Sequence, residues 1–279
     1  MIALLLEPLH YQYMQKALLA ATVVGGVCAL LSVYLMLKGW SLVGDALSHA
    51  VVPGVAAAYA LSLPYTVGAF FAGMLAMLGM LALRRLPMLR QDAVIGFVFT
   101  TFFAAGLLLI SLNPTAINLE AVIYGQILAI ADRDLVQMLV ISAITLIVLA
   151  VQWRTFMLLF FDEVQAMVSG LPVRRLQLLF FALVSMAVVA ALQAVGAILV
   201  IALLIAPGAT AFLLSKRFGR VLWIALAIGI TTCIFGVYIS YYLDLVPGAM
   251  IVLLQTACFL GVFIHSHVRH QRHARRQTA

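Results

Sequence analysis

The most chemically distinctive residues of this chain are an aspartate and a histidine four positions apart, Asp45 and His49, inside a strongly apolar sequence. If this segment is helical, the two side chains lie one turn apart on the same face and can converge on one ion. Ionisable groups are costly in hydrocarbon and rare in membrane spans, so such a pair indicates a functional site. A structural alternative remains open, in which Asp45 caps a helix and His49 is a buried, hydrogen-bonded side chain.

The composition places the chain among polytopic membrane proteins. Hydrophobic residues make up 66% and charged residues 9% of the 279 positions, and the mean hydropathy is +1.19. A soluble domain carries about 25% charged residues. The net charge of +7 comes from short basic clusters between apolar runs, the pattern of cytoplasmic loops rather than of a nucleic-acid-binding surface. Cys28, Cys233 and Cys258 lie within apolar runs and are interpreted as packing residues.

Apolar runs of about 20 residues predict the membrane-spanning helices. A shorter segment at 45–62 carries Pro53 and Gly54 and is predicted to be either a further span or a re-entrant helix. The fold class is therefore an all-α polytopic membrane protein with about eight spans and this short helix. The predicted spans are 14–37, 65–83, 93–112, 135–153, 176–193, 195–214, 221–243 and 247–265.

Four basic clusters set the orientation of these spans. They lie near residues 84–90, 154–175, 216–220 and 269–276, and the positive-inside rule places all of them in the cytoplasm. Two topologies of the first sixty residues satisfy this rule. A full span at 45–62 gives nine spans and an external N-terminus, whereas a re-entrant segment gives eight spans, a cytoplasmic N-terminus and a metal-ligand pair open to the exterior. We favour the re-entrant segment, because broken helices are tolerated at membrane depth where they line a cavity.

The loop at 154–175 carries a second distinctive motif. Asp162 and Glu163 begin a short helix-forming stretch that ends at Gly170, which is the polarity expected of helix start and stop signals. A cytoplasmic hairpin with its own short helix suits docking to a soluble partner. On composition alone, an ordinary hairpin at the membrane interface is the favoured interpretation.

Three stretches resemble one family of membrane proteins. The spacing Glu163-x-x-Ala166-x-x-x-Gly170 resembles the coupling-helix motif of importer permeases driven by ATP-binding cassette (ABC) subunits. Residues 38–54, which hold Asp45 and His49, resemble the signature of the metal-specific branch, the zinc, manganese and iron permeases. Residues 196–211 resemble a later helix of the same family. The similarity covers residues 10–265. Within the family, the chain most resembles the manganese and iron members found with periplasmic binding proteins.

The resemblance implies a type II ABC importer fold and a function. The chain would be the permease subunit of an ATP-driven importer of a divalent transition metal, with Mn²⁺ or Fe²⁺ favoured and Zn²⁺ as the alternative. A carboxylate and an imidazole suit all three ions. Asp45 and His49 match the family positions that contact metal, and Ser48 and Gln193 are further candidates to line the pathway. The residues implied in coupling to the ATPase are Asp162, Glu163, Ala166 and Gly170.

The same resemblance implies the partners and the division of the chain. The partners would be an ATPase dimer in the cytoplasm, an extracytoplasmic metal-binding protein, which Glu120 could contact, and a second copy of this permease or a related one. The location would be the inner membrane of a bacterium. We expect no permanently bound cofactor and no enzymatic activity of the chain itself. Residues 1–266 would form the transmembrane permease domain, and the basic tail at 267–279 is predicted to be disordered.

A different class of transporter is the main alternative. Asp45 and His49 could form a proton relay in a proton- or sodium-coupled secondary transporter, and broken helices suit such folds. The sequence lacks the glycine-rich loop with lysine that binds ATP, so any ATP hydrolysis requires another subunit. It also lacks the motifs of an intramembrane protease. A purely structural scaffold is disfavoured by the ionisable pair inside an apolar segment.

Overall fold

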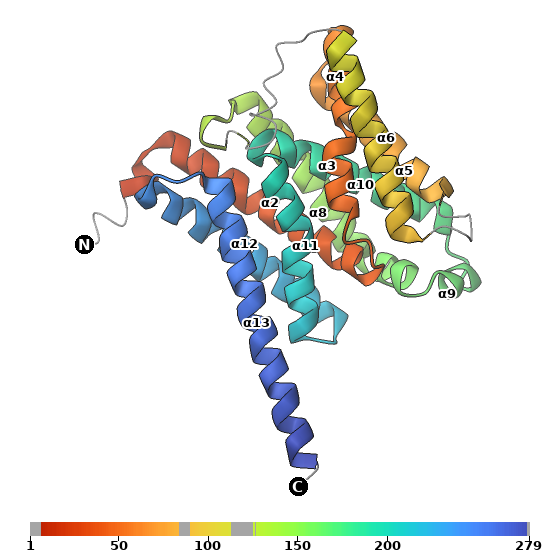
Figure 1. The fold of residues 1–279 in the computed structure, drawn as a ribbon, viewed down its shortest axis with the longest axis vertical. Helices are drawn as coiled ribbons and strands as arrows, with labels where there is room; N and C mark the ends of the chain where they lie inside the picture. The colour runs from red at the N-terminus through yellow and green to blue at the C-terminus, as the bar shows by residue number, and fades with distance from the viewer. Residues whose placement is uncertain (1–6, 84–89, 113–124, 126, 278–279) are drawn as a thin grey trace.

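The computed structural model describes residues 7–83, 90–112, 125 and 127–277, and the regular structure in these ranges is entirely helical. Eight of the described helices are long and apolar enough to cross a bilayer, which confirms the predicted spans. These helices are α2, α5, α6, α8 and α10 to α13, and Figure 1 shows them packed into one bundle from which α13 projects. The elements are η1 (Glu7–His10), α2 (Gln12–Leu37), α3 (Val43–Ala50), α4 (Val52–Ala60), α5 (Tyr65–Leu83), α6 (Gln91–Leu112), η2 (Ile127–Ala129), α8 (Asp132–Phe161), α9 (Glu163–Val168), α10 (Val173–Val195), α11 (Ala197–Leu214), α12 (Phe218–Leu243) and α13 (Pro247–Gln277).

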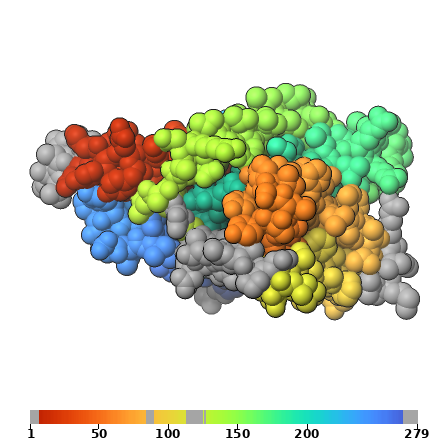
Figure 2. Space-filling model, turned by 90° about the horizontal axis from the view of Figure 1, so that it is seen from above, coloured from red at the N-terminus to blue at the C-terminus, as the bar shows by residue number. Residues whose placement is uncertain are grey.

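Helix α2 is the centre of the bundle, and small residues let its neighbours approach it closely. A Cβ atom at Gly25 would lie 2.5 Å from Sγ of Cys233 and 3.0 Å from the carbonyl oxygen of Gly229, both on α12. Side chains on lipid-embedded helices gain nothing by leaving lipid for protein, so helix association depends on such close packing. The view in Figure 2 shows the ends of α2 and α12 (red and blue) together at one side of the molecule.

Helix α11 is hydrogen-bonded to α2 next to a proline. Pro207 lies inside α11 and cannot donate a backbone hydrogen bond. Beside it, the Ser32 hydroxyl of α2 accepts a bond from the Gly208 amide (3.0 Å) and donates to the carbonyl of Ile205 (3.3 Å). A serine from a neighbouring helix thus bonds to backbone groups on either side of the proline, and bonds of this kind help membrane helices to tolerate proline.

The segment around Asp45 and His49 forms two short helices, α3 and α4, that meet at Val51. The backbone of Val51 remains helical (φ −78°, ψ −16°), so α3 and α4 continue in nearly the same direction. End to end they run parallel to α6 through the bundle (Figure 1). The neighbouring residues, in order along the two segments, are Val43 with Ile95, His49 with Phe99 and Phe103, and Pro53 with Gly106.

A contact at the start of this segment decides between the two predicted topologies. Lys38, at the end of α2, lies 3.1 Å from Glu163 of the 154–175 loop. Residues 38–44 are therefore on the same side as that loop, which the positive-inside rule places in the cytoplasm. The nine-span topology, with α3 and α4 together as one crossing, fits this contact, and the re-entrant topology that we favoured does not. Pro53 misled the prediction because it occupies the first turn of α4, where proline is accepted, and does not break the segment.

The backbone of α13 is helical to Gln277, and the disorder predicted for the tail at 267–279 stays a prediction. Arginine, the most frequent residue of this tail, is favourable in helices. Basic residues near a helix C-terminus also complement the helix dipole. The portion of α13 that is long and apolar enough to span a bilayer ends at Val268, so the remaining turns extend past it.

The nine-span topology predicts which sites are labelled from outside the cell. In a variant lacking the three native cysteines, Leu9→Cys should react with a membrane-impermeant maleimide in intact cells. Leu42→Cys should react only after the membrane is permeabilised, since residue 42 lies on the side of the 154–175 loop. Leu61→Cys serves as the control, because both topologies place it outside. Labelling of position 42, but not of position 9, in intact cells would restore the re-entrant topology.

Candidate functional site

Asp45 and His49 share one face of α3 and point away from the bundle interior. His49 Nε2 lies 3.7 Å from Asp45 Oδ1, and the side chains of His49 and Asp45 are 32% and 45% exposed. The α3 residues between them are buried. The structure therefore brings the two predicted metal ligands together and leaves their donor atoms accessible, as a metal-binding pair requires.

Two neighbouring helices fix the position of this pair. On one side the His49 imidazole packs edge-on against Phe99 and Phe103 of α6, with ring centroids 5.4 and 5.5 Å apart. On the other side Gly44 lets α3 approach α11, because a Cβ atom there would lie 2.9 Å from Leu204 Cδ1. Aromatic edge contacts restrict the rotation of the imidazole and so orient its nitrogen atoms.

The pair by itself supplies an incomplete ligand set. In the described part of the chain, no group of three or more His, Cys, Asp or Glu side chains is placed to hold a metal. The pair offers a carboxylate oxygen and an imidazole nitrogen, and first-row divalent metals take four to six such ligands. A metal bound to this pair would take its further ligands from other groups, such as water or another chain facing the same surface of α3.

The other two predicted pathway residues lie elsewhere. Ser48 is 2% exposed, and its hydroxyl donates a hydrogen bond to the carbonyl of Gly44 within α3 (2.9 Å). Gln193 is exposed near the end of α10, where its amide nitrogen donates to Thr66 Oγ1 at the start of α5 (3.1 Å). The structure therefore does not bring either residue to the open face of Asp45 and His49. Glu120 lies outside the described residues.

The predicted coupling motif forms helix α9, which is capped at both ends. At its start Asp162 Oδ1 accepts a hydrogen bond from the Gln165 amide (2.9 Å), the expected N-cap bond. At its end Gly170 has a φ of +77°, a conformation that favours glycine. The amides of Gly170 and Leu171 then close the helix on the carbonyls of Met167 and Ala166, at 3.0 and 3.1 Å.

Helix α9 has a buried face and an exposed apolar face. Ala166 is fully buried, and α9 packs on α8 and α10. The opposite face exposes three large apolar side chains, and Phe161 at the end of α8 is exposed beside them; exposed apolar patches of this kind often mark sites of protein interaction. The predicted coupling residues thus build and hold α9, while its exposed apolar residues were not singled out from the sequence. Their i, i+3, i+4 spacing was the available signal; they are Val164, Met167 and Val168.

Glu163 differs from its neighbours because its carboxylate turns back toward the bundle. Lys38 Nζ lies 3.1 Å from Oε2, and Gln177 Nε2 donates to Oε1 at 2.9 Å. The side chain of Lys38 is 13% exposed and that of Glu163 is 33% exposed. Glu163 therefore ties α9 to the end of α2 and to α10.

Comparison with known proteins supports one family. Residues 10–266 match the ABC 3 transport family. The chelated iron transport system membrane protein YfeC of Yersinia pestis is 57% identical over 263 residues, which cover 94% of this chain and 90% of that protein. The manganese transport system membrane protein MntB of a Synechocystis species is 43% identical over 263 residues, with coverages of 93% and 85%.

Solved structures show the same architecture. PsaBC from Streptococcus pneumoniae, in complex with a Fab, superposes with a TM-score of 0.84 at 33% identity and covers 94% of this chain and 95% of that one. A metal-chelate type ABC transporter in an inward-facing conformation superposes with a TM-score of 0.70 at 18% identity, with coverages of 90% and 86%. The second likeness concerns the fold alone.

The N-cap of α9 predicts a local loss of stability on substitution. Asp162→Ala removes the bond to the Gln165 amide and should destabilise α9 by about 1 kcal/mol. Amide hydrogen exchange in α9 should then be roughly fivefold faster. Asp162→Asn keeps an acceptor at the same position and should exchange as the wild type does. Equal exchange rates in Asp162→Ala and wild type would contradict a capping role.

Proposed function

This chain belongs to the ABC 3 transport family, and from that premise we propose that it is the permease subunit of an ATP-driven importer of divalent Mn²⁺ or Fe²⁺. The observation that carries the proposal is the accessible Asp45–His49 pair on α3. An aspartate and a histidine lie here on a short helix among membrane-spanning helices, where ionisable residues are costly. The names of its relatives, which are iron and manganese transport proteins, support the choice of metals.

The incomplete ligand set of one chain supports a site shared between two permeases. If the α3 helices of two copies faced each other, two carboxylates and two imidazoles would surround one axis. Imidazole nitrogen suits Mn²⁺, Fe²⁺ and Zn²⁺, whereas Ca²⁺ and Mg²⁺ prefer shells made of oxygen. The remaining positions would be filled by water, which keeps binding weak enough for the ion to leave.

The exposed apolar face of α9 supports a cytoplasmic ATPase as partner. Val164, Met167 and Val168 would insert into a groove of the ATP-binding cassette subunit, and a metal-binding protein would deliver the ion to the opposite side of the inner membrane. ATP binding would close the ATPase dimer and displace α9. That displacement would open or close the route on either side of Asp45 and His49.

Metal uptake tests the proposed site. In proteoliposomes that hold the permease with its ATPase, Asp45→Ala and His49→Ala should each lower ATP-dependent uptake of Mn²⁺ and Fe²⁺ by at least about tenfold, because each removes a metal ligand. Both variants should still copurify with the ATPase. The matched control is Ser48→Ala, which alters a buried neighbour on the same helix and should transport as the wild type does.

Two outcomes of this measurement would count against the proposal. Normal uptake by Asp45→Ala would show that the pair does not bind the transported metal. Uptake that ignores ATP but follows a proton gradient would instead identify a secondary transporter. Uptake of Zn²⁺ alone would keep the transporter class and change the ion.

A pair of glycine variants tests coupling through α9. A Cβ atom has open space at both Gly170 and Gly219, but only Gly170 has a positive φ. Gly170→Ala should therefore strain the end of α9 by about 1 kcal/mol or more and lower the metal imported per ATP hydrolysed several-fold. Gly219→Ala should leave that ratio unchanged. An equal ratio in the two variants would contradict a role of the α9 terminus in coupling.

A further inference from the structure

A partly buried ion pair joins α9 to the end of α2, the helix that precedes α3 in the chain. Lys38 ends α2, and Glu163 begins α9. The Lys38 side chain is 13% exposed, so its charge is largely withdrawn from water. Removal of either partner would leave the other charge uncompensated in this environment. Gln177 donates a hydrogen bond to the second carboxylate oxygen of Glu163, which helps to offset the partial burial of that group.

Both charges also suit their places in the backbone. Lys38 is the C-cap of α2, where the helix dipole favours a cation, and Glu163 lies in the first turn of α9, where it favours an anion. The ion pair therefore connects two helix ends of opposite polarity. Movement of α9 away from α2 would have to break this contact or carry the end of α2 with it.

The turn after Lys38 connects this ion pair rigidly to α3. Gly39 has a φ of +74°, and the amides of Gly39 and Trp40 bond back to the carbonyls of Met36 and Leu35, at 3.1 and 2.8 Å. These bonds close the end of α2 and fix the direction in which the chain leaves. Helix α3 begins at Val43, so only a short turn separates Lys38 from the helix that holds Asp45.

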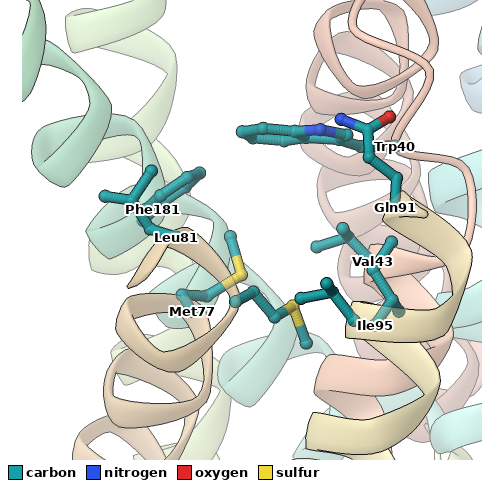
Figure 3. Close-up of a pocket in the computed structure, with 9 residues that line it drawn as sticks. Trp40, Val43, Met77, Leu81, Gln91, Ile95 and Phe181 are labelled. Atoms are coloured by element: carbon teal, nitrogen blue, oxygen red, sulfur yellow. The ribbon is translucent and has the colours of Figure 1, made fainter. Parts of the chain in front are cut away.

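The surroundings of Trp40 leave this turn room to move. Its indole packs on Phe181 of α10, with ring centroids 5.3 Å apart. Figure 3 shows Trp40 and Val43 at the edge of a cavity of about 30 Å³ whose other walls come from α5, α6 and Phe181 of α10. Interiors are normally close-packed, so this cavity allows a small displacement of the start of α3 without expelling a neighbour. The facing residues include Met77, Leu81 and Ile95.

We propose that the Lys38–Glu163 ion pair passes the movement of α9 to α3, which makes Lys38 a positioning residue for the metal-binding pair. The inference rests on the proposed function, because it takes α9 as the docking site of the ATPase and Asp45 with His49 as the metal ligands. In this account the α2–α3 turn follows α9 when the ATPase dimer closes, and α3 shifts into the space beside Trp40.

The opposite end of α2 offers a matched control. Lys16 forms an ion pair with Asp132 at the start of α8, and the two side chains are 35% and 79% exposed. This ion pair joins the same helix to a neighbour but lies far from α9 along α2. Lys16→Met therefore removes a lysine and an ion pair from α2 without affecting the connection to the coupling helix.

Transport stoichiometry tests the proposal in the reconstituted permease and ATPase, with Mn²⁺ as the probe. Lys38→Met should lower the Mn²⁺ imported per ATP hydrolysed by about tenfold while ATP hydrolysis stays within about twofold of wild type, since the ATPase still docks on α9. Lys16→Met should keep the wild-type ratio. The exchanged double variant Lys38→Glu, Glu163→Lys should recover at least half of that ratio, because the Gln177 amide can turn its oxygen toward an ammonium group.

A wild-type ratio in Lys38→Met would overturn the proposal. So would an exchanged variant as impaired as the single one, because Lys38 would then act by some means other than this ion pair. Both tests measure the ratio of Mn²⁺ import to ATP hydrolysis. Misfolding would lower both activities together and would not change this ratio selectively.

Hydrogen exchange distinguishes failure of this inference from failure of the proposed function. Binding of the ATPase with a non-hydrolysable ATP analogue should slow the amide exchange of residues 39–50 at least about threefold in wild type and in Lys16→Met. In Lys38→Met the slowing should be confined to α9. Slowing at 39–50 in Lys38→Met, or its absence in wild type, would overturn the inference. A wild-type complex that shows the slowing but imports no metal would instead contradict the proposed function.

Discussion

Close backbone contact around α2 is the constraint on which the rest of this structure depends. In lipid the association of helices relies on packing and on hydrogen bonds between them. Gly25 has no side chain, so the backbone of α12 can lie close to that of α2. The hydrogen bond between Ser32 and Gly208 holds α11 against α2 next to its proline. Because α2 is held from both sides, the point where it ends and the direction of the turn at Gly39 are fixed. The path of α3 and α4 follows from that turn.

The proposed chemistry depends on where α3 is covered and where it is not. α6 and α11 flank α3, and the buried residues of its inner face leave only Asp45 and His49 accessible. A carboxylate and an imidazole at such a place are costly unless something compensates them. A metal ion held between two permeases would compensate the carboxylates, and this links the incomplete ligand set to the assembly that we propose.

Much of the fold and the ligand pair could be predicted from the sequence. Hydropathy identified the eight long helices, because each has at least 18 residues, is strongly apolar and contains few charges. The Asp45–His49 spacing predicted a shared face, because α-helical geometry places i and i+4 one turn apart. Asp162 and Gly170 likewise predicted the ends of α9, since both act through local backbone geometry.

The remainder required tertiary contacts that no local pattern contains. Pro53 suggested a break, but its place in the first turn of α4 is visible only once Val51 is known to be helical. The side of the membrane occupied by residues 38–44 was decided by the contact of Lys38 with Glu163, which lie 125 positions apart. The burial of Ser48 and the hydrogen bond of its hydroxyl to Gly44 within α3 were likewise not visible in the sequence.

The measurement that tests the central claim most directly is an anomalous-scattering map of the assembled importer crystallised with Mn²⁺. The account predicts an anomalous peak on the axis between two permeases, within coordinating distance of Asp45 and His49 from each copy. A well-occupied peak inside the membrane that lies away from both residues, with no density beside α3, would contradict it.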